Sequence, residues 1–543
     1  MKIGLISTDS YIYSHGVRAI SAYLKSKGHK TLLLSMPLPY AINEDNQRKL
    51  NFSTDKYSKK AILQMLNLVK DSDVIGISSL AANTKKALQL IKALKKLNKP
   101  IIWGGIFATT FPEFCIKHAD IVCIGEGELA LEELLKKIEL GKNYYKTKNF
   151  WFKKGNKIIK NPIRPLFADL DKLPNYDYSP RTNYVLEKNK TFKKLNQKHI
   201  GNWLYYHGIR GCPFSCKYCC NCHLKMLYKN KGIYIRKRSI KLVIQDLEQL
   251  KKQFPKLQWI WITDDDINMR TIEELKEFRE LYRKKIKLPF RCYMTPVTIT
   301  EEKLKLLLEA GLGQIEVGIQ TASDRVNKEV YGRPITKQQT LKAINLLHKY
   351  LRYMRSPTSY QLIITNPYEK KEEVLETIKF VLKMPTPFHL APFGIVFFPG
   401  SPLYNQAVKD GIIKKFEDSA YDLDYINLYE HTKIKSKNLY YNTLLYFMWG
   451  QNTKFIKGAI PKIIIKPLLS SKTTEFFNTH PQLLLKISKL RYLLVRSSVP
   501  SIKLKRSLNK AKGIIYNLVP KKVKEPVKSF LGLEGQKPVR FST

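Results

Sequence analysis

The chain has 543 residues, enough for two to four domains that each bury a hydrophobic core. Its formal net charge of +50 would suit an anionic partner. However, the lysines are spread along the whole sequence, as AT-rich codon usage would produce, and no RRM, OB-fold or zinc-finger pattern accompanies them. We therefore do not expect nucleic acid as a partner, while peripheral contact with a membrane surface stays open.

The distribution of cysteines indicates a reducing compartment. Eight cysteines are present, and five of them lie within residues 212–222, which is not typical of a disulfide framework. The first residues enter an apolar strand pattern without a cleavable signal, and no apolar run reaches the roughly 18–20 residues that span a bilayer. We expect a cytoplasmic protein without a transmembrane segment.

Residues 1–145 alternate apolar strands with amphipathic helices, which predicts a doubly wound, flavodoxin- or Rossmann-like parallel sheet. The expected strands are residues 3–7, 31–35, 74–78, 101–103 and 121–124. Ligands bind at the carboxyl ends of such strands, where glycine lets a bulky group approach the backbone. The residues at these ends that we expect to bind a cofactor are Ser78, Ser79, Leu80, Gly104, Gly105, Gly125, Glu126 and Gly127.

Residues 146–195 are interpreted as a linker, with a hairpin turn at 154–156. Residues 196–415 then alternate strands and helices again and predict six β/α units. The expected strands are one before Cys212 and residues 259–263, 290–294, 314–319, 361–365 and 394–398; Ser239 is expected to cap a helix. Residues 416–543 predict a basic, mostly helical C-terminal domain, in which 483–495 could lie on a membrane surface or in a core.

Three cysteines, Cys212, Cys216 and Cys219, are spaced C-x3-C-x2-C and place three soft thiolate ligands on one short loop. A cubic [4Fe–4S] cluster held by three cysteines keeps one iron free to bind a substrate or cofactor. The alternative is a zinc site, but zinc loops usually present C-x2-C pairs and a fourth ligand. The neighbouring Cys220 and Cys222 are interpreted as non-ligands, since a second cluster would need further cysteines.

This loop resembles the signature of the radical S-adenosylmethionine (radical SAM) superfamily, in which an aromatic residue precedes the last cysteine. The resemblance implies a partial (β/α)6 TIM-like barrel whose [4Fe–4S] cluster binds S-adenosylmethionine. An external one-electron reductant then drives cleavage to a 5′-deoxyadenosyl radical. Sequence motifs after the cysteine loop also resemble those of this family, although Gln320 stands where the family has an acidic residue. The residues that the resemblance implies for binding the cofactor are Tyr218, Asp264, Asp265, Glu316, Gln320 and Gly400.

The N-terminal region resembles the cobalamin-binding domain found ahead of many radical SAM enzymes, through residues 73–79, 104–105 and 125–128. It departs from the D-x-H-x-x-G signature, because Asp9 and His15 lie at the wrong spacing. The departure would leave the lower cobalt face without a histidine ligand.

Together the two resemblances imply cobalamin as a third cofactor and C-methylation of an unactivated carbon in a small-molecule or lipid-like substrate. Three alternatives stay open: cobalamin-dependent cyclisation or rearrangement, tRNA modification, and a non-catalytic cobalamin or cluster sensor. The sequence does not identify the substrate.

Overall fold

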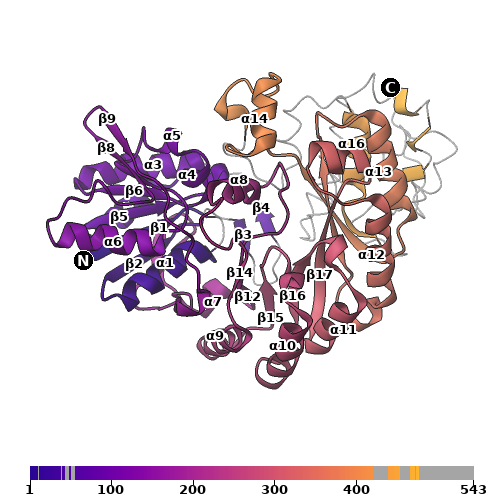
Figure 1. Ribbon diagram of the computed structural model, residues 1–543, viewed down its shortest axis with the longest axis horizontal. Coiled ribbons are helices and arrows are strands. Elements are labelled where there is room, and N and C mark those ends of the chain that lie inside the picture. Colours follow the sequence, from indigo (N-terminus) through magenta and orange to yellow (C-terminus); the bar gives the residue numbers. More distant parts are fainter. Residues whose placement is uncertain are drawn as a thin grey trace, which may run out of the picture.

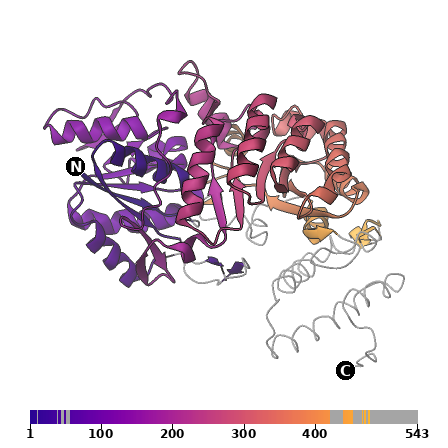
Figure 2. The same cartoon turned by 90° about the horizontal axis from the view of Figure 1, so that it is seen from below.

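Two sheets organise the chain in the computed structural model, which describes residues 1–9, 12–37, 40–42, 48–50, 56–419, 438–452, 465–466, 468–470 and 473–475. The first sheet and its helices form the N-terminal half, and the second sheet lies beside it with helices along its outer side (Figures 1 and 2).

The five strands predicted in the first 145 residues form the parallel centre of the first sheet. Their order is β2 (Lys30–Ser35), β1 (Lys2–Ser7), β5 (Val74–Ser78), β6 (Ile101–Gly104) and β7 (Ile121–Cys123). Both faces of these strands are apolar, and each face packs on its own pair of helices. One face is covered by α2 (Lys59–Val69) and α3 (Thr84–Leu94), the other by α1 (His15–Ser26) and α6 (Glu128–Glu139). The predicted doubly wound domain is thus confirmed.

The segment interpreted as a linker belongs to this sheet. The hairpin of β8 (Phe150–Lys154) and β9 (Lys157–Lys160) pairs antiparallel with β7, and its turn lies where the sequence predicts it. At the opposite edge β10 (Asn183–Glu187) pairs in parallel with β2 and antiparallel with β11 (Thr191–Lys194). Residues 146–195 therefore extend the first sheet at both edges before the chain enters the second.

The second sheet contains six parallel strands, the number that the sequence predicts. Their order is β12 (Trp203–Tyr206), β15 (Trp259–Ile262), β16 (Phe290–Met294), β17 (Leu312–Gln320), β18 (Ser359–Ile364) and β19 (Phe388–Gly394), with β20 (Gly450–Asn452) antiparallel at the edge. In the described part of the chain β12 and β19 are not paired, so the barrel is open. One predicted strand is misplaced: residues 395–398 follow β19, and Ile395 and Phe397 pack with Val326 and Leu403 instead.

The helices of the second sheet pack their apolar stripes on its outer face. They are α9 (Ile240–Gln253), α10 (Ile272–Lys285), α11 (Glu301–Ala310), α12 (Lys337–Lys349) and α13 (Lys371–Lys383). Ser239 precedes α9 as predicted, but its side chain makes no capping hydrogen bond.

Past residue 415 the structure describes only part of the chain. Helix α16 (Leu439–Phe447) is buried on nearly all sides and packs into the core of the second sheet. Residues 483–495 lie outside the described residues. None of the described helices is both long and apolar enough to cross a membrane.

Candidate active site

The three cysteines of the predicted cluster loop lie between β13 (Ile209–Arg210) and β14 (Arg236–Lys237), followed by helix α8 (Cys220–Leu227). All three are partly exposed and none forms a disulfide. The loop begins at Gly211, where a Cβ would come within 2.4 Å of the Tyr234 carbonyl oxygen and where φ is +99°. Only glycine suits that backbone conformation and that contact. In the described residues, no three His, Cys, Asp or Glu side chains group closely enough to hold a single metal ion.

The second domain holds the cysteine loop from two sides. The Lys217 amide donates to the Tyr331 carbonyl (2.8 Å), and the Lys217 carbonyl accepts from the Leu403 amide (2.9 Å). The Tyr218 ring meets the Tyr331 ring edge-on, with centroids 5.1 Å apart. Backbone hydrogen bonds and ring packing thus fix the loop that carries the three thiols.

Gly400 lies where α8 approaches the first domain. Its carbonyl oxygen is 3.0 Å from His223 Nδ1, which donates to it, and a Cβ at Gly400 would lie 2.5 Å from the Thr110 carbonyl oxygen. Thr110 ends α4 (Ile106–Thr110), which follows β6. The predicted cofactor residue Gly400 therefore contacts both α8 and the first domain.

The three aspartates after β15 have different environments. Asp264 accepts hydrogen bonds from the amides of Gly208 (2.6 Å) and Ile209 (2.9 Å), which lead into the cysteine loop. Asp266 caps a turn inside the protein, and burial raises its pKa to about 6. Asp265 lines a cavity and accepts from the Asn221 side chain (3.0 Å). Of the three carboxylates, Asp265 is the one that a bound cofactor can reach.

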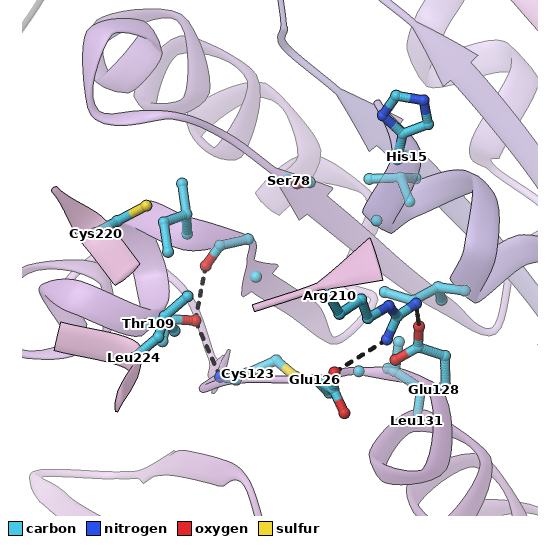
Figure 3. A pocket seen from close by; sticks show the side chains of 18 of the residues that line it. His15, Ser78, Thr109, Cys123, Glu126, Glu128, Leu131, Arg210, Cys220 and Leu224 are labelled. Atoms are coloured by element: carbon cyan, nitrogen blue, oxygen red, sulfur yellow. Dashed lines mark hydrogen bonds and ion pairs between the residues drawn. The ribbon is translucent and has the colours of Figure 1, made fainter. Parts of the chain in front are cut away.

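A cavity of about 540 Å³ lies between the carboxyl ends of β1, β5, β6 and β7 and helix α8 (Figure 3). The predicted residues that line it are Ser78, Gly104, Gly105, Gly125, Glu126, Gly127 and Asp265. Ser79 and Leu80 do not line it; the Ser79 hydroxyl accepts from the Trp103 indole (2.9 Å). The lining residues that sequence analysis did not single out include Thr109, Arg210, Tyr228 and Arg236.

Two glycines keep the first-domain side of this cavity open. Gly105 (φ +91°) and Gly125 (φ +79°) both have backbone conformations that favour glycine. A Cβ at Gly125 would lie 1.9 Å from the Tyr228 hydroxyl oxygen. Thr109 joins the two turns, because its hydroxyl donates to the Gly105 carbonyl and accepts from the Gly125 amide. The two glycines therefore add backbone atoms, and no side chain, to the lining of the cavity.

Two histidines form another wall of the cavity. His15 Nε2 donates to the Tyr205 carbonyl (3.1 Å), and His207 Nδ1 donates to the Thr263 carbonyl (3.0 Å). Their ring centroids are 5.8 Å apart. Burial, together with the neighbouring His207, lowers the pKa of His15 to about 3, so this imidazole is neutral at physiological pH. His15 is therefore placed as a neutral side chain at the junction of the two domains.

The remaining predicted residues lie along β17. Glu316 is paired with Arg291 and accepts from the Gln361 amide (2.8 Å), while the Arg291 guanidinium lies 3.9 Å from the Trp261 ring centroid. Gln320 ends the strand with φ +70°, next to a segment whose carbonyls accept from Arg333. A polar cluster thus runs along the strand toward the carboxyl end.

Glu369, in the loop after β18, accepts a hydrogen bond from Thr321 (3.0 Å), and burial raises its pKa to about 8. Because ionisation is easier in the unfolded chain, this carboxyl group destabilises the fold increasingly as pH rises from about 4.3 to 8. Glu369→Gln should therefore raise the free energy of unfolding by on the order of 4 kcal/mol at pH 8.5 but only about 1–2 kcal/mol at pH 5.5. Denaturant titrations at both pH values measure this difference, with exposed Glu372→Gln as control. A gain that does not depend on pH would contradict the assignment.

These features define a class of protein: an open parallel barrel with a three-thiol loop at its carboxyl edge, facing a glycine-lined cavity on a doubly wound domain. The donor set fits a cluster with one free iron, because three unpaired thiols lie on one rigid loop. The cavity fits a bulky planar cofactor, because four glycines, Gly104, Gly105, Gly125 and Gly127, line its first-domain side.

Comparisons with known proteins agree with both assignments. Residues 206–381 match the model of the radical SAM superfamily, and residues 1–135 match the model of the B12 binding domain. An uncharacterised methyltransferase of Pyrococcus horikoshii is 26% identical over 352 residues, which cover 63% of this chain and 71% of the relative. The cytidylyl-2-hydroxyethylphosphonate methyltransferase of Streptomyces wedmorensis is 24% identical over 78% of this chain and 84% of its own length. The solved structure of the cobalamin-dependent S-adenosylmethionine radical enzyme OxsB has a similar fold (TM-score 0.60, 14% identity, 98% of this chain and 75% of that one).

The chain therefore belongs to the radical SAM superfamily and carries a B12 binding domain ahead of its radical SAM domain. The cofactors of these domains are a [4Fe–4S] cluster with S-adenosylmethionine, and cobalamin.

Proposed function

We propose that this enzyme methylates an unactivated carbon of a small molecule, with cobalamin as the methyl carrier. The observation that carries the proposal is the shared cavity. Its first-domain side is formed by the glycine turns after β6 and β7, and its barrel side by α8 and Asp265. A corrin on the glycine turns would face a cofactor held at the cysteine loop, as methyl transfer to a substrate radical requires.

The roles of the residues follow from this arrangement. Cys212, Cys216 and Cys219 would hold the cluster, whose chemistry is reductive cleavage of S-adenosylmethionine to an organic radical. Asp265 would accept from the methionine ammonium group, because its carboxylate faces the cavity. The neutral His15 and the glycine turns would contact the corrin from the first domain.

The reaction partners are also part of the proposal. The relative that acts on a cytidylyl phosphonate supports a small-molecule methyl acceptor. A lipid-like acceptor and peripheral membrane contact remain compatible with the net charge of +50. We propose that an external reductant donates one electron at a time to the cluster. We also propose that the enzyme acts in the cytoplasm, where its eight cysteines would stay reduced.

Cofactor analysis of the anaerobically purified enzyme tests the proposal. We expect one corrinoid and about four irons per chain, and formation of 5′-deoxyadenosine when S-adenosylmethionine and a reductant are added. Iron without corrinoid would contradict the methyl-carrier role and favour an RNA-modifying enzyme. A loaded cluster that yields no 5′-deoxyadenosine would instead favour a sensor.

A further inference from the structure

A group of four charges, two of them buried and two partly buried, joins the first domain to the hairpin that carries the cysteine loop. Arg210 donates to Glu126 (3.1 Å) and to Glu128 (2.6 Å), and Arg236 lies 2.9 Å from the Glu126 carboxylate (Figure 3 shows the Arg210 contacts). Glu126 lies in the turn after β7 and Glu128 begins α6. Arg210 and Arg236 are paired with each other on β13 and β14. The group links two segments that are 84 residues apart in sequence.

These contacts differ from ordinary surface ion pairs. The Glu128 and Arg236 side chains are only 4% and 6% exposed. Burial acts to raise the pKa of Glu126, but Arg210 and Arg236 outweigh it and hold that pKa below its usual value. Glu126 makes two further hydrogen bonds. Its carboxylate accepts from the Phe167 amide (2.9 Å), and its backbone amide donates to the hydroxyl of Tyr228, which follows α8 (2.8 Å). Removing one partner would leave a buried charge uncompensated, which is costly.

The two ends of this group reach both proposed cofactor sites. On one side, Gly125, Glu126 and Gly127 line the cavity at the first domain. On the other, Arg210 lies directly before Gly211 and Cys212, the start of the cysteine loop. The side chain of Arg210 therefore spans the short distance between the turn beneath the corrin site and the loop of the cluster site.

We propose that Arg210 is a positioning residue that, through Glu126 and Glu128, fixes the corrin-binding turn relative to the cluster loop. The proposal rests on the cofactor assignment above. It concerns the separation and orientation of the two cofactors, and it assigns Arg210 no contact with the reacting atoms.

The test uses holoenzyme in which the corrin cobalt and the cluster are both paramagnetic, so that electron paramagnetic resonance reports their magnetic coupling. We expect resolved spin–spin splitting in the unaltered enzyme. In Arg210→Gln, iron and corrinoid contents should stay near normal while the splitting is lost or broadened. Arg210→Lys should restore part of the splitting, because its single ammonium can pair with one carboxylate only. Arg279→Gln, which breaks an exposed ion pair with Glu309, should leave the spectrum unchanged.

The outcomes separate this proposal from the proposed function. Splitting that is unchanged in Arg210→Gln would overturn the role of Arg210 while keeping the cofactor assignment. Uncoupled spectra from a fully loaded unaltered enzyme would instead contradict the facing arrangement of the cofactors. If Arg210→Gln fails to load its cofactors, Glu128→Gln decides, because the Glu128 carboxylate accepts a hydrogen bond from Arg210 (2.6 Å). An unaltered splitting in Glu128→Gln would overturn the proposal.

Discussion

Replacing Cys212, Cys216 and Cys219 together with alanine is expected to abolish the iron–sulfur cluster and, with it, all formation of 5′-deoxyadenosine. The three thiols lie on one loop fixed by Tyr331 and Leu403, and no other segment of the described chain presents three cysteines. The triple variant removes all three proposed protein ligands, so the cluster has nothing to bind it. Iron and sulfide content after anaerobic reconstitution, with the absorbance of the cluster, measures the result.

Two other cysteines provide matched controls. Cys222 is buried on α8, and Cys292 is fully buried in the core of the second sheet, where burial raises the pKa of its thiol well above the usual value. Cys222→Ala and Cys292→Ala should therefore retain full iron content. A cluster that survives in the triple variant, or is lost in Cys222→Ala, would refute the ligand assignment.

The second large effect is expected at Gly104, which ends β6 and lines the cavity. A Cβ there would lie 3.6 Å from the Cβ of Cys123, an ordinary van der Waals contact, so alanine should be accepted without backbone strain. A phenylalanine would extend into the space proposed for the corrin. We expect Gly104→Phe to lose corrinoid almost completely and to keep its iron, because the cysteine loop belongs to the other domain.

The size series at this one position supplies the control. Gly104→Ala should bind corrinoid nearly as well as the unaltered enzyme, as measured by spectrophotometric titration of the corrin-free protein. Normal corrinoid content in Gly104→Phe would show that the cofactor lies elsewhere.

Sequence reasoning predicted the elements that depend on local pattern. Apolar runs predicted the five parallel strands of the first domain, and the spacing of the cysteines predicted the cluster-binding loop. The pairing of β10 with β2 and of β11 with β10 escaped it, because these strands are short and partly polar and were interpreted as a linker. The shift of the last barrel strand to Phe388–Gly394 has a similar cause, since the apolar residues 395–398 serve another core cluster.

The candidate site was predictable only in part, for reasons of geometry. Side chains along an extended chain alternate in direction, so neighbouring aspartates do not share one environment: Asp264 binds backbone amides whereas Asp265 lines the cavity. Arg210 carried no signal at all, because its partner Glu126 is 84 residues away. Contacts of that kind become visible only when the two domains are placed together.

The most direct test of the central claim runs the 5′-deoxyadenosine assay with S-adenosylmethionine labelled in its methyl group. If cobalamin carries the methyl group, the loaded enzyme should form 5′-deoxyadenosine and the label should appear on the enzyme's corrin. Mass spectrometry detects the labelled corrin without knowledge of the methyl acceptor. Formation of 5′-deoxyadenosine with a corrin that never acquires label would contradict the role of cobalamin as methyl carrier and favour cyclisation or rearrangement.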